Sequence, residues 1–419
     1  MIKYFLSLAL LGASSLAIAE ENTNKLDLVS AYQKTLKRSP ILKEAKSQLE
    51  IAIAELEQAS AWLNPDFEFE MENFNGSGQF SGTNVAEYTY SLSQKFEVGG
   101  KRTARTETAL KRLRAAEADY IIAERLVKKN VTIAYINAVA ASQNLKLTEE
   151  QEYLAQTVLN TVKKRVEAAR EPEIQQRKAE VAYATASLKR QQMAREAQLA
   201  RAELATFWGD SFFSEILQTD TFFSPVAPED YQFYESKLSE APQLRRYQSL
   251  INAQKSEADF ERAQNIPDPT FRLGVRDFNE NGEQALVAGL SFPLPIFNRN
   301  GGNIRKALSE ITVIEQQGQQ ARLSLTQKLD ENWQTWQQAA QESERLQSSI
   351  IPSAEEAFKL AREGYDKGRF PYLEVLDAQR TLFDARAQYH DALMRMHTSR
   401  ANVMAIIPDT QPSLTELKE

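Results

Sequence analysis

The stretch that decides the fold is residues 101–169, which read KRTARTETALKRLRAAEADYIIAERLVKKNVTIAYINAVAASQNLKLTEEQEYLAQTVLNTVKKRVEAA. It contains neither Pro nor Gly, the residues that most often interrupt a helix. A single helix of about 70 residues is about 105 Å long. Apolar and small residues recur every three or four positions and form a narrow seam, namely Leu110, Leu113, Ala116, Tyr120, Ala123, Val127, Val131, Ala134 and Ala138. Such a long helix is typical of a coiled coil or a helical tube.

Three further helices are expected on the same grounds. Pro172 is expected to begin a helix that runs to about residue 207. In the second half, one helix is expected over about 303–367, with a break near Pro352, and another over about 371–404. The chain is therefore predicted to be mainly α-helical.

The chain repeats itself at a spacing of about 200 residues. Similar short stretches recur in the same order: Ser39-Pro40-Ile41-Leu42 and Ala241-Pro242-Gln243-Leu244, Pro65-Asp66 and Pro267-Asp268, Gly99-Gly100 and Gly301-Gly302. Each half is expected to contain a helix, two strands and two long helices. We therefore divide the chain into a first repeat (20–209), a linker (210–240), a second repeat (241–408) and a C-terminal tail (409–419).

Four short stretches alternate apolar and polar residues, which predicts strands with one apolar and one polar face. They cover about 66–74, 87–96, 270–278 and 285–294. In the first of them Phe67, Phe69 and Met71 alternate with acidic residues, and in the third the polar side carries two arginines. The charged residues of the polar faces are Glu68, Glu70, Glu72, Arg272 and Arg276.

Four strands cannot close a membrane barrel, since the smallest such barrels have about eight. Either several subunits share one sheet, or the strands lie in water, as two hairpins or packed on a helix. In a shared barrel the five charged residues would line a wet lumen, with the two arginines on a strand neighbouring the three glutamates. Three chains would give twelve strands, although eight strands from two chains also satisfy this reasoning. An ordinary solvated face is the alternative role for these charges.

Composition excludes several classes of site. The 419 residues include no Cys and two His, with 50 Lys and Arg against 57 Asp and Glu. A disulfide, a thiolate metal site and a cysteine nucleophile are therefore impossible, and a histidine-rich zinc site is not expected. The negative net charge does not suit nucleic acid. Met394, Met396, His390 and His397 are too poorly spaced for a metal site, and we find no catalytic or cofactor motif.

Residues 1–19 are typical of a secretory signal peptide. Lys3 precedes an apolar run, and Ala17-Ile18-Ala19 resembles a cleavage site. The run is short for an uncleaved anchor, and no later stretch reaches the ~18 apolar residues of a membrane helix. The protein is expected in the periplasm or outer membrane of a Gram-negative bacterium.

The chain resembles the TolC-type outer-membrane efflux proteins over nearly all of its length after residue 19. The stretches that carry the resemblance are Ser39–Leu42 with Leu63–Asp66, Phe96–Arg102, Phe292–Gly302 and Gly364–Arg380. The second and third look most like the branch that works with RND pumps for cobalt, zinc and cadmium or for copper and silver. Some relatives carry a lipidated Cys after the signal peptide. This chain has none, so we expect the barrel alone to anchor it.

The resemblance implies a homotrimer with a twelve-stranded barrel in the lipid of the outer membrane. A helical barrel would continue it into the periplasm. An inner-membrane RND pump and a periplasmic adaptor (membrane fusion) protein would complete the assembly. The family catalyses no reaction, and it uses no cofactor. A drug or type I secretion exit duct of the same fold, and a soluble periplasmic coiled-coil adaptor, are the alternatives to a metal efflux channel.

The resemblance also implies roles for residues at the helix ends. Glu374 and Asp377, three apart on one helix face, would form a selective periplasmic aperture, although acids also favour a helix N-terminus for electrostatic reasons. Tyr365 and Arg369 would form bonds that keep the channel closed, with simple surface contacts as the alternative role. The turns at the tips would consist of Ala169, Arg170, Pro172, Gly368 and Pro371, with Ala169-Arg170 in place of the Gly-Leu pair usual in the family.

Overall fold

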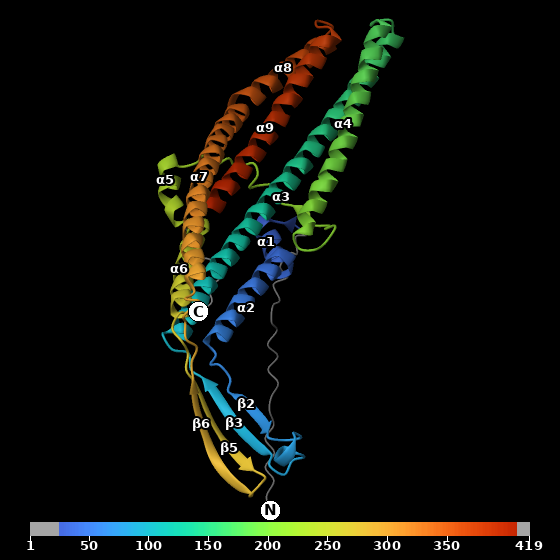
Figure 1. Cartoon of the computed structure of the whole chain (residues 1–419). Coiled ribbons are helices and arrows are strands. Elements are labelled where there is room, and N and C mark those ends of the chain that lie inside the picture. The colour runs from blue at the N-terminus through green and yellow to red at the C-terminus, as the bar shows by residue number, and fades with distance from the viewer. Residues whose placement is uncertain (1–24, 409–419) are drawn as a thin grey trace, which may run out of the picture.

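The computed structural model describes residues 25–408, so the expected signal peptide and C-terminal tail lie outside the described residues. The molecule is elongated (Figure 1). A four-stranded sheet forms one end, and two long helical hairpins form the other. This agrees with the predicted fold class, which is mainly α-helical with a small β part and a two-fold internal repeat.

The two hairpins come from the two repeats. In the first, α3 (Lys101–Glu167) is followed by α4 (Glu173–Thr206). In the second, α7 (Gly301–Arg345) and α8 (Ile351–Asp366) are followed by α9 (Tyr372–Ile406). The 67 residues of α3 make a helix about 100 Å long. Among residues 25–408, no helix combines the length and the apolar character needed to cross a membrane.

The break expected near residue 352 is a change of helix type and not an interruption. A π-helix over Leu346–Ile350 joins α7 to α8. Pro352, in the first turn of α8, has no N–H to donate back to the preceding turn, and one wider turn accommodates this defect. The chain is therefore helical from residue 301 to residue 366, with a local irregularity.

Shorter elements surround the middle of the molecule (Figure 1). They are β1 (Lys25–Leu26), α1 (Leu28–Arg38), α2 (Pro40–Ser60), β4 (Ile216–Leu217), α5 (Tyr231–Lys237) and α6 (Pro242–Ala263), with a 3-10 turn at Leu238–Glu240. Another 3-10 turn, Gly78–Phe80, lies in the loop between β2 and β3 at the end of the sheet. α2 packs on α3, and α6 contacts both α3 and α7. β1 and β4 form a short parallel pair. Pro40 and Pro242 both stand in the first turn of their helices, where their missing N–H costs nothing.

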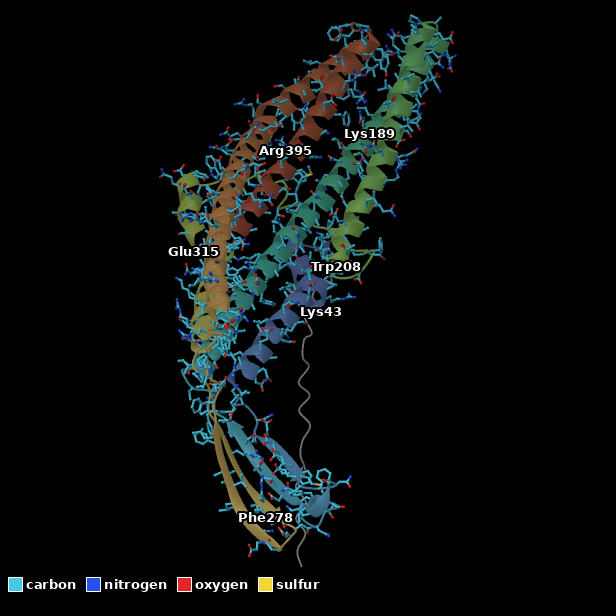
Figure 2. All side chains as sticks on the ribbon, viewed as in Figure 1. Lys43, Lys189, Trp208, Phe278, Glu315 and Arg395 are labelled. Carbon is cyan, nitrogen blue, oxygen red and sulfur yellow. The ribbon has the colours of Figure 1, made fainter. Side chains whose placement is uncertain are left out.

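The sheet has the order β2-β3-β5-β6 and is antiparallel throughout. Its strands are β2 (Asp66–Glu72), β3 (Glu87–Lys95), β5 (Thr270–Phe278) and β6 (Glu283–Ser291). Both hairpins belong to one sheet because β3 pairs with β5. Phe278 lies at the end of the sheet farthest from the helices (Figure 2). β6 ends before the predicted residue 294 because Pro293 cannot donate to a ladder.

The main hydrophobic core lies where the helices overlap, at mid-length. Its largest fully buried side chains include Trp208, Trp336 and Tyr135, and Figure 2 shows Trp208 at the foot of α4 beside α1. Aromatic donors from α3 and α7 also hold the segment after β4. The Tyr135 hydroxyl donates to the carbonyl of Gln218 (2.8 Å), and Trp336 Nε1 donates to that of Val226 (2.6 Å). The expected linker is thus a packed part of the core.

A buried ion pair connects the two repeats where the sheet meets the helices. Lys101, the first residue of α3, contacts Asp268 Oδ1 at 2.7 Å, and both side chains are almost fully buried. Burial raises the pKa of Asp268, but the hydrogen bonds from Lys101 and from the Val98 amide outweigh it, so that the pKa is lowered overall. The charged pair fixes the direction in which α3 leaves the sheet.

Candidate functional site

One face of the sheet is apolar and bare. Its side chains are at least partly exposed along all four strands, and Leu286 on β6 is 82% exposed. The exposed large residues of this face are Phe67, Phe69, Tyr90, Leu92, Phe271, Leu273, Val275, Leu286 and Leu290. Monomeric soluble proteins rarely expose a continuous apolar surface of this kind, which usually marks contact with a membrane or a partner. In the described chain nothing packs on it.

The opposite face is polar, and its charged side chains cover the small residues of β3. Thr89 and Ser91 are buried beneath Arg276 and Arg272, whose Nε atoms donate to the two hydroxyls at 2.9 and 2.8 Å. Four ion pairs cross this face: Arg272 with Glu68 (3.4 Å) and Glu70 (2.7 Å), and Arg276 with Glu72 (2.8 Å) and Glu87 (2.7 Å). The sheet therefore buries small polar side chains and exposes apolar ones, which is the opposite of the distribution usual in a soluble protein.

The expectation that the arginines lie on a strand neighbouring the glutamates of β2 is wrong. β3 lies between β2 and β5, and both arginines reach across it. Residues with short side chains on this face of β3 leave room for them. Gly274, between the two arginines, serves the same packing, since a Cβ there would lie 2.7 Å from Cβ of Ser91 and 2.5 Å from the Tyr90 carbonyl oxygen.

The two tip turns have the same backbone geometry. In the first, Ala169 has φ 54°, and the amides of Ala169 and Arg170 donate to Val166 (2.9 Å) and Arg165 (2.8 Å). In the second, Gly368 has φ 70°, and the corresponding bonds run from Gly368 to Tyr365 (3.0 Å) and from Arg369 to Gly364 (2.7 Å). This is the Schellman arrangement, in which a left-handed residue ends the helix. Pro172 and Pro371 stand directly before α4 and α9.

Tyr365 and Arg369 are not bonded to each other. The Tyr365 side chain is only 3% exposed and packs on Tyr372, with ring centroids 5.9 Å apart. Its buried hydroxyl has no hydrogen-bond partner within residues 25–408. Arg369 is exposed on the turn. Tyr365 contributes an aromatic ring to a small core with Leu159, Val162 and Val375. The closing role expected of Tyr365 and Arg369 stays a prediction.

Arg165, near the end of α3, makes a polar contact between the two tips. Its guanidinium donates to the carbonyls of Tyr365 (3.0 Å) and Asp366 (3.2 Å), and it lies 4.1 Å from the centroid of the Tyr365 ring. The Glu171 and Asp366 carboxylates are each 4.0 Å away. The sequence pattern did not single out Arg165, because one basic residue in the last turn of a helix is common.

Glu374 and Asp377 lie on one face of α9, in its first turns, and both are exposed. They line one cavity of about 510 Å³ between α8 and α9, whose other walls are mostly small or apolar, including Ala354, Ala357, Ala361 and Ala378. Among residues 25–408, no Lys, Arg or His nitrogen lies within 4.0 Å of either carboxylate, so neither acid forms an ion pair there. The two acids are thus available to an external cation.

The two histidines have structural surroundings. His390 Nδ1 is 2.8 Å from Asn144 Oδ1, and His397 Nε2 is 3.0 Å from the Phe222 carbonyl oxygen. Burial lowers the pKa of His390 to about 4 and lowers that of His397. Residues 25–408 contain no group of three or more His, Cys, Asp or Glu placed to hold a metal ion.

A family model described as "Outer membrane efflux protein" matches residues 31–210 and 233–407. The chain belongs to this family. This efflux protein is 28% identical over 369 residues to the cobalt-zinc-cadmium resistance protein CzcC of Cupriavidus metallidurans. The match covers 87% of this chain and 86% of CzcC. It is also 28% identical over 296 residues to the nickel and cobalt resistance protein CnrC of the same species, covering 70% and 69% of the two chains.

Solved channels show the same fold. One of them is CusC, which was solved in a study of folding and transmembrane channel formation. The efflux protein matches it with a TM-score of 0.78 at 18% identity, over 91% of this chain and 92% of CusC. It matches the outer membrane protein VceC of Vibrio cholerae with a TM-score of 0.76 at 18% identity, over 90% and 95%. The family places this protein in the outer membrane.

Proposed function

We propose that this efflux protein is the exit duct of a tripartite system that exports divalent heavy-metal cations. It works as a homotrimer, with an RND pump in the inner membrane and a periplasmic adaptor between the two. Cobalt, zinc and cadmium are the expected cargo, because the relatives are named for resistance to these metals and to nickel.

The bare apolar face of the sheet is the single observation that carries the proposal. An apolar face of this kind is stable in contact with lipid. The edge strands of an open sheet are not stable there, because their backbone N–H and C=O groups find no hydrogen-bond partner in lipid. The edges in this chain are β2 and β6. Pairing β6 of one copy with β2 of the next removes every edge, and three copies give a closed barrel of twelve strands.

The polar face then lines the lumen. Four carboxylates and two guanidiniums meet on it in each chain, so that the wall of the lumen carries net negative charge. A lumen of this sign favours cations over anions. The ion pairs hold the long side chains flat against the wall, which keeps the path open.

The helical tips form the gate. Arg165 joins the end of α3 to the turn after α8, and releasing it removes this polar link between the tips while the small core around Tyr365 remains. Glu374 and Asp377 stand just beyond this contact, and three copies supply six carboxylates around the mouth. Tyr365 positions the turn through packing, while Arg369, Arg170 and the rest of the tip turns face the adaptor.

Growth on metals tests the function. A strain without this protein should lose resistance to cobalt, zinc or cadmium, and the native chain should restore it. Restoration by the native chain is compared with restoration by a variant that carries Glu374→Gln, Asp377→Asn and Arg165→Ala. The matched control is Lys359→Gln, an exposed change on α8. The same sensitivity to all three metals with and without the native chain would reject metal export, and recovery of the native chain in the soluble periplasmic fraction would reject the channel itself.

A further inference from the structure

The two repeats connect strand to helix differently. Between β3 and α3 there are five residues (96–100), whereas nine residues (292–300) separate β6 from α7. The short connection is tied to its surroundings, since Glu97 pairs with Arg105 and the Val98 amide donates to Asp268 (3.0 Å). The longer one carries the sequence Phe292-Pro293-Leu294-Pro295-Ile296-Phe297-Asn298-Arg299-Asn300. We call it the 292–300 loop.

The 292–300 loop presents large apolar side chains to its surroundings. Phe297 is 99% exposed, and Phe292, Leu294 and Ile296 are each more than half exposed. Phe292 follows Leu286 and Leu290 at even spacing, so the loop begins as a continuation of the apolar face of β6. The lipid-facing surface of the sheet therefore extends past the last ladder hydrogen bond toward the helices.

The backbone of the loop suits an apolar environment. Pro293 and Pro295 have no N–H, and the Ile296 amide already donates to the Leu294 carbonyl (2.9 Å). These three positions therefore present no free amide group that would lose water without a partner. Its far end is fixed, because the Asn300 side chain donates to the Glu261 carbonyl (2.9 Å) and the Asn300 backbone amide donates to Asn298 Oδ1 (2.9 Å). A fixed segment presents its side chains with little loss of entropy.

Aromatic and basic side chains gather at the same level of the molecule. Trp62, just before β2, is 67% exposed, and the Arg102 guanidinium lies 4.4 Å from the centroid of its ring. Arg299 within the loop, and Arg305 in the first turns of α7, are exposed. Aromatic rings beside cations are characteristic of the headgroup level of a membrane, where the inner leaflet offers anionic phospholipids.

We propose that the 292–300 loop inserts into the periplasmic-side leaflet of the outer membrane and binds anionic phospholipid through Arg299. This rests on the proposed function, which places the sheet in that membrane. The apolar side chains enter the leaflet around Phe297, and Arg299 stays at the phosphate level. The loop thereby sets the depth of the barrel, at the boundary between the sheet and the helices, in one repeat only.

The chain has no Cys, so single cysteines give unique labels. We would reconstitute the full chain with Phe297→Cys, Leu286→Cys or Ile174→Cys in phosphatidylethanolamine–phosphatidylglycerol vesicles and attach an environment-sensitive fluorophore. Leu286 reports the sheet, and Ile174, exposed on α4, reports the tip. Quenching by iodide in water and by lipids spin-labelled at the headgroup or in the acyl chain then places each label.

We expect spin-labelled lipids to quench positions 297 and 286, with the headgroup label relatively more effective at 297 than at 286, and iodide to quench position 174. Iodide quenching at 297 with lipid quenching at 286 would overturn the loop proposal and leave the channel intact. Iodide quenching at both would reject the channel as well. Protection of position 297 from every quencher would identify a protein partner, either a second copy or an adaptor, and would also overturn the proposal.

Lipid preference supplies an independent readout. A cation near an anionic surface changes affinity by about fivefold, so Arg299→Gln should lower the preference for spin-labelled phosphatidylglycerol over phosphatidylcholine by about that factor. Lys189→Gln, an exposed change on α4 far from the loop, should leave the preference unchanged. An unaltered preference in the Arg299 variant would exclude its role in binding headgroups.

Discussion

The two ends of the molecule distribute apolar and charged side chains in opposite ways. At the sheet end, Leu286 and Leu273 face outward while Thr89 lies buried beneath arginines. At the tip end, Tyr365 and Tyr372 are buried together and the charged residues face outward. Both ends come from the same two repeats. The difference teaches that one end suits lipid and the other suits water, and that the long helices separate the two environments.

Reversing the character of the sheet should have the largest effect. Leu273→Lys places a charge in the middle of the bare face, where lipid exposure costs about 2–4 kcal/mol. We expect a large loss of the protein from the outer-membrane fraction. Gln284→Lys, on the same face but at the far end of the sheet, costs about 0–1 kcal/mol near the membrane surface and is the matched control. Normal membrane recovery of Leu273→Lys would mean that this face is not in lipid.

Breaking the contact between the tips should have the next largest effect. Arg165→Ala removes two charge-assisted hydrogen bonds, each worth about 1.5–3 kcal/mol, and an interaction with the Tyr365 ring. Open-channel events in planar bilayers should become more than tenfold more frequent. Arg170→Ala changes the same charge on the neighbouring turn and should leave the frequency near the native value. Equal behaviour of the two variants would assign gating elsewhere.

Neutralising the mouth should have a moderate effect. A unit charge about 4 Å from an ion contributes about 1 kcal/mol in water, so Glu374→Gln with Asp377→Asn should lower the cation-to-anion permeability ratio by about fivefold or more. Reversal potentials in a salt gradient measure the ratio. The control is Glu356→Gln with Glu363→Gln, two exposed acids on α8 outside the cavity. An unchanged ratio in the first variant would discard the carboxylate aperture.

Relaxing the first tip turn should stabilise the protein slightly. Ala169 occupies the left-handed region, which costs an L-residue about 1 kcal/mol and glycine almost nothing. Ala169→Gly should therefore raise the free energy of unfolding of this hairpin by up to about 1 kcal/mol, as followed by hydrogen exchange near the turn. Ala168→Gly, with φ −82°, should lower it instead. Destabilisation by Ala169→Gly would contradict the observed turn.

Removing one hydroxyl should have the smallest effect. The buried Tyr365 hydroxyl has no partner in residues 25–408, so Tyr365→Phe should change stability and gating little, whereas Tyr365→Ala should cost about 3–5 kcal/mol of local packing. Thermal unfolding and bilayer recordings of the two variants separate packing from hydrogen bonding. A gating defect in Tyr365→Phe as large as that of Arg165→Ala would mean that the Tyr365 hydroxyl takes part in gating.

Much of the fold follows from periodicity. Period two from Phe67 to Met71 and the absence of Pro and Gly over 101–169 predict strands and helices within a few residues of their observed ends. The pairing of β3 with β5 could not be predicted, because no local pattern relates residues about 180 apart. For the same reason the reach of Arg272 over β3, and the link from Arg165 to Tyr365, became visible only in three dimensions. The placement of Glu374 and Asp377 on one exposed face of a helix was predictable from their spacing, and their role as an aperture stays a prediction.

The central claim is that the sheet is a barrel wall with lipid on one side and water on the other. Single cysteines at Leu286, Val287, Ala288, Gly289 and Leu290 in isolated outer membranes test it most directly, through their reaction with a membrane-impermeant maleimide. We predict an alternating pattern in which positions 287 and 289 react from the lumen while 286, 288 and 290 are protected by lipid. Uniform reaction at all five positions would contradict the account.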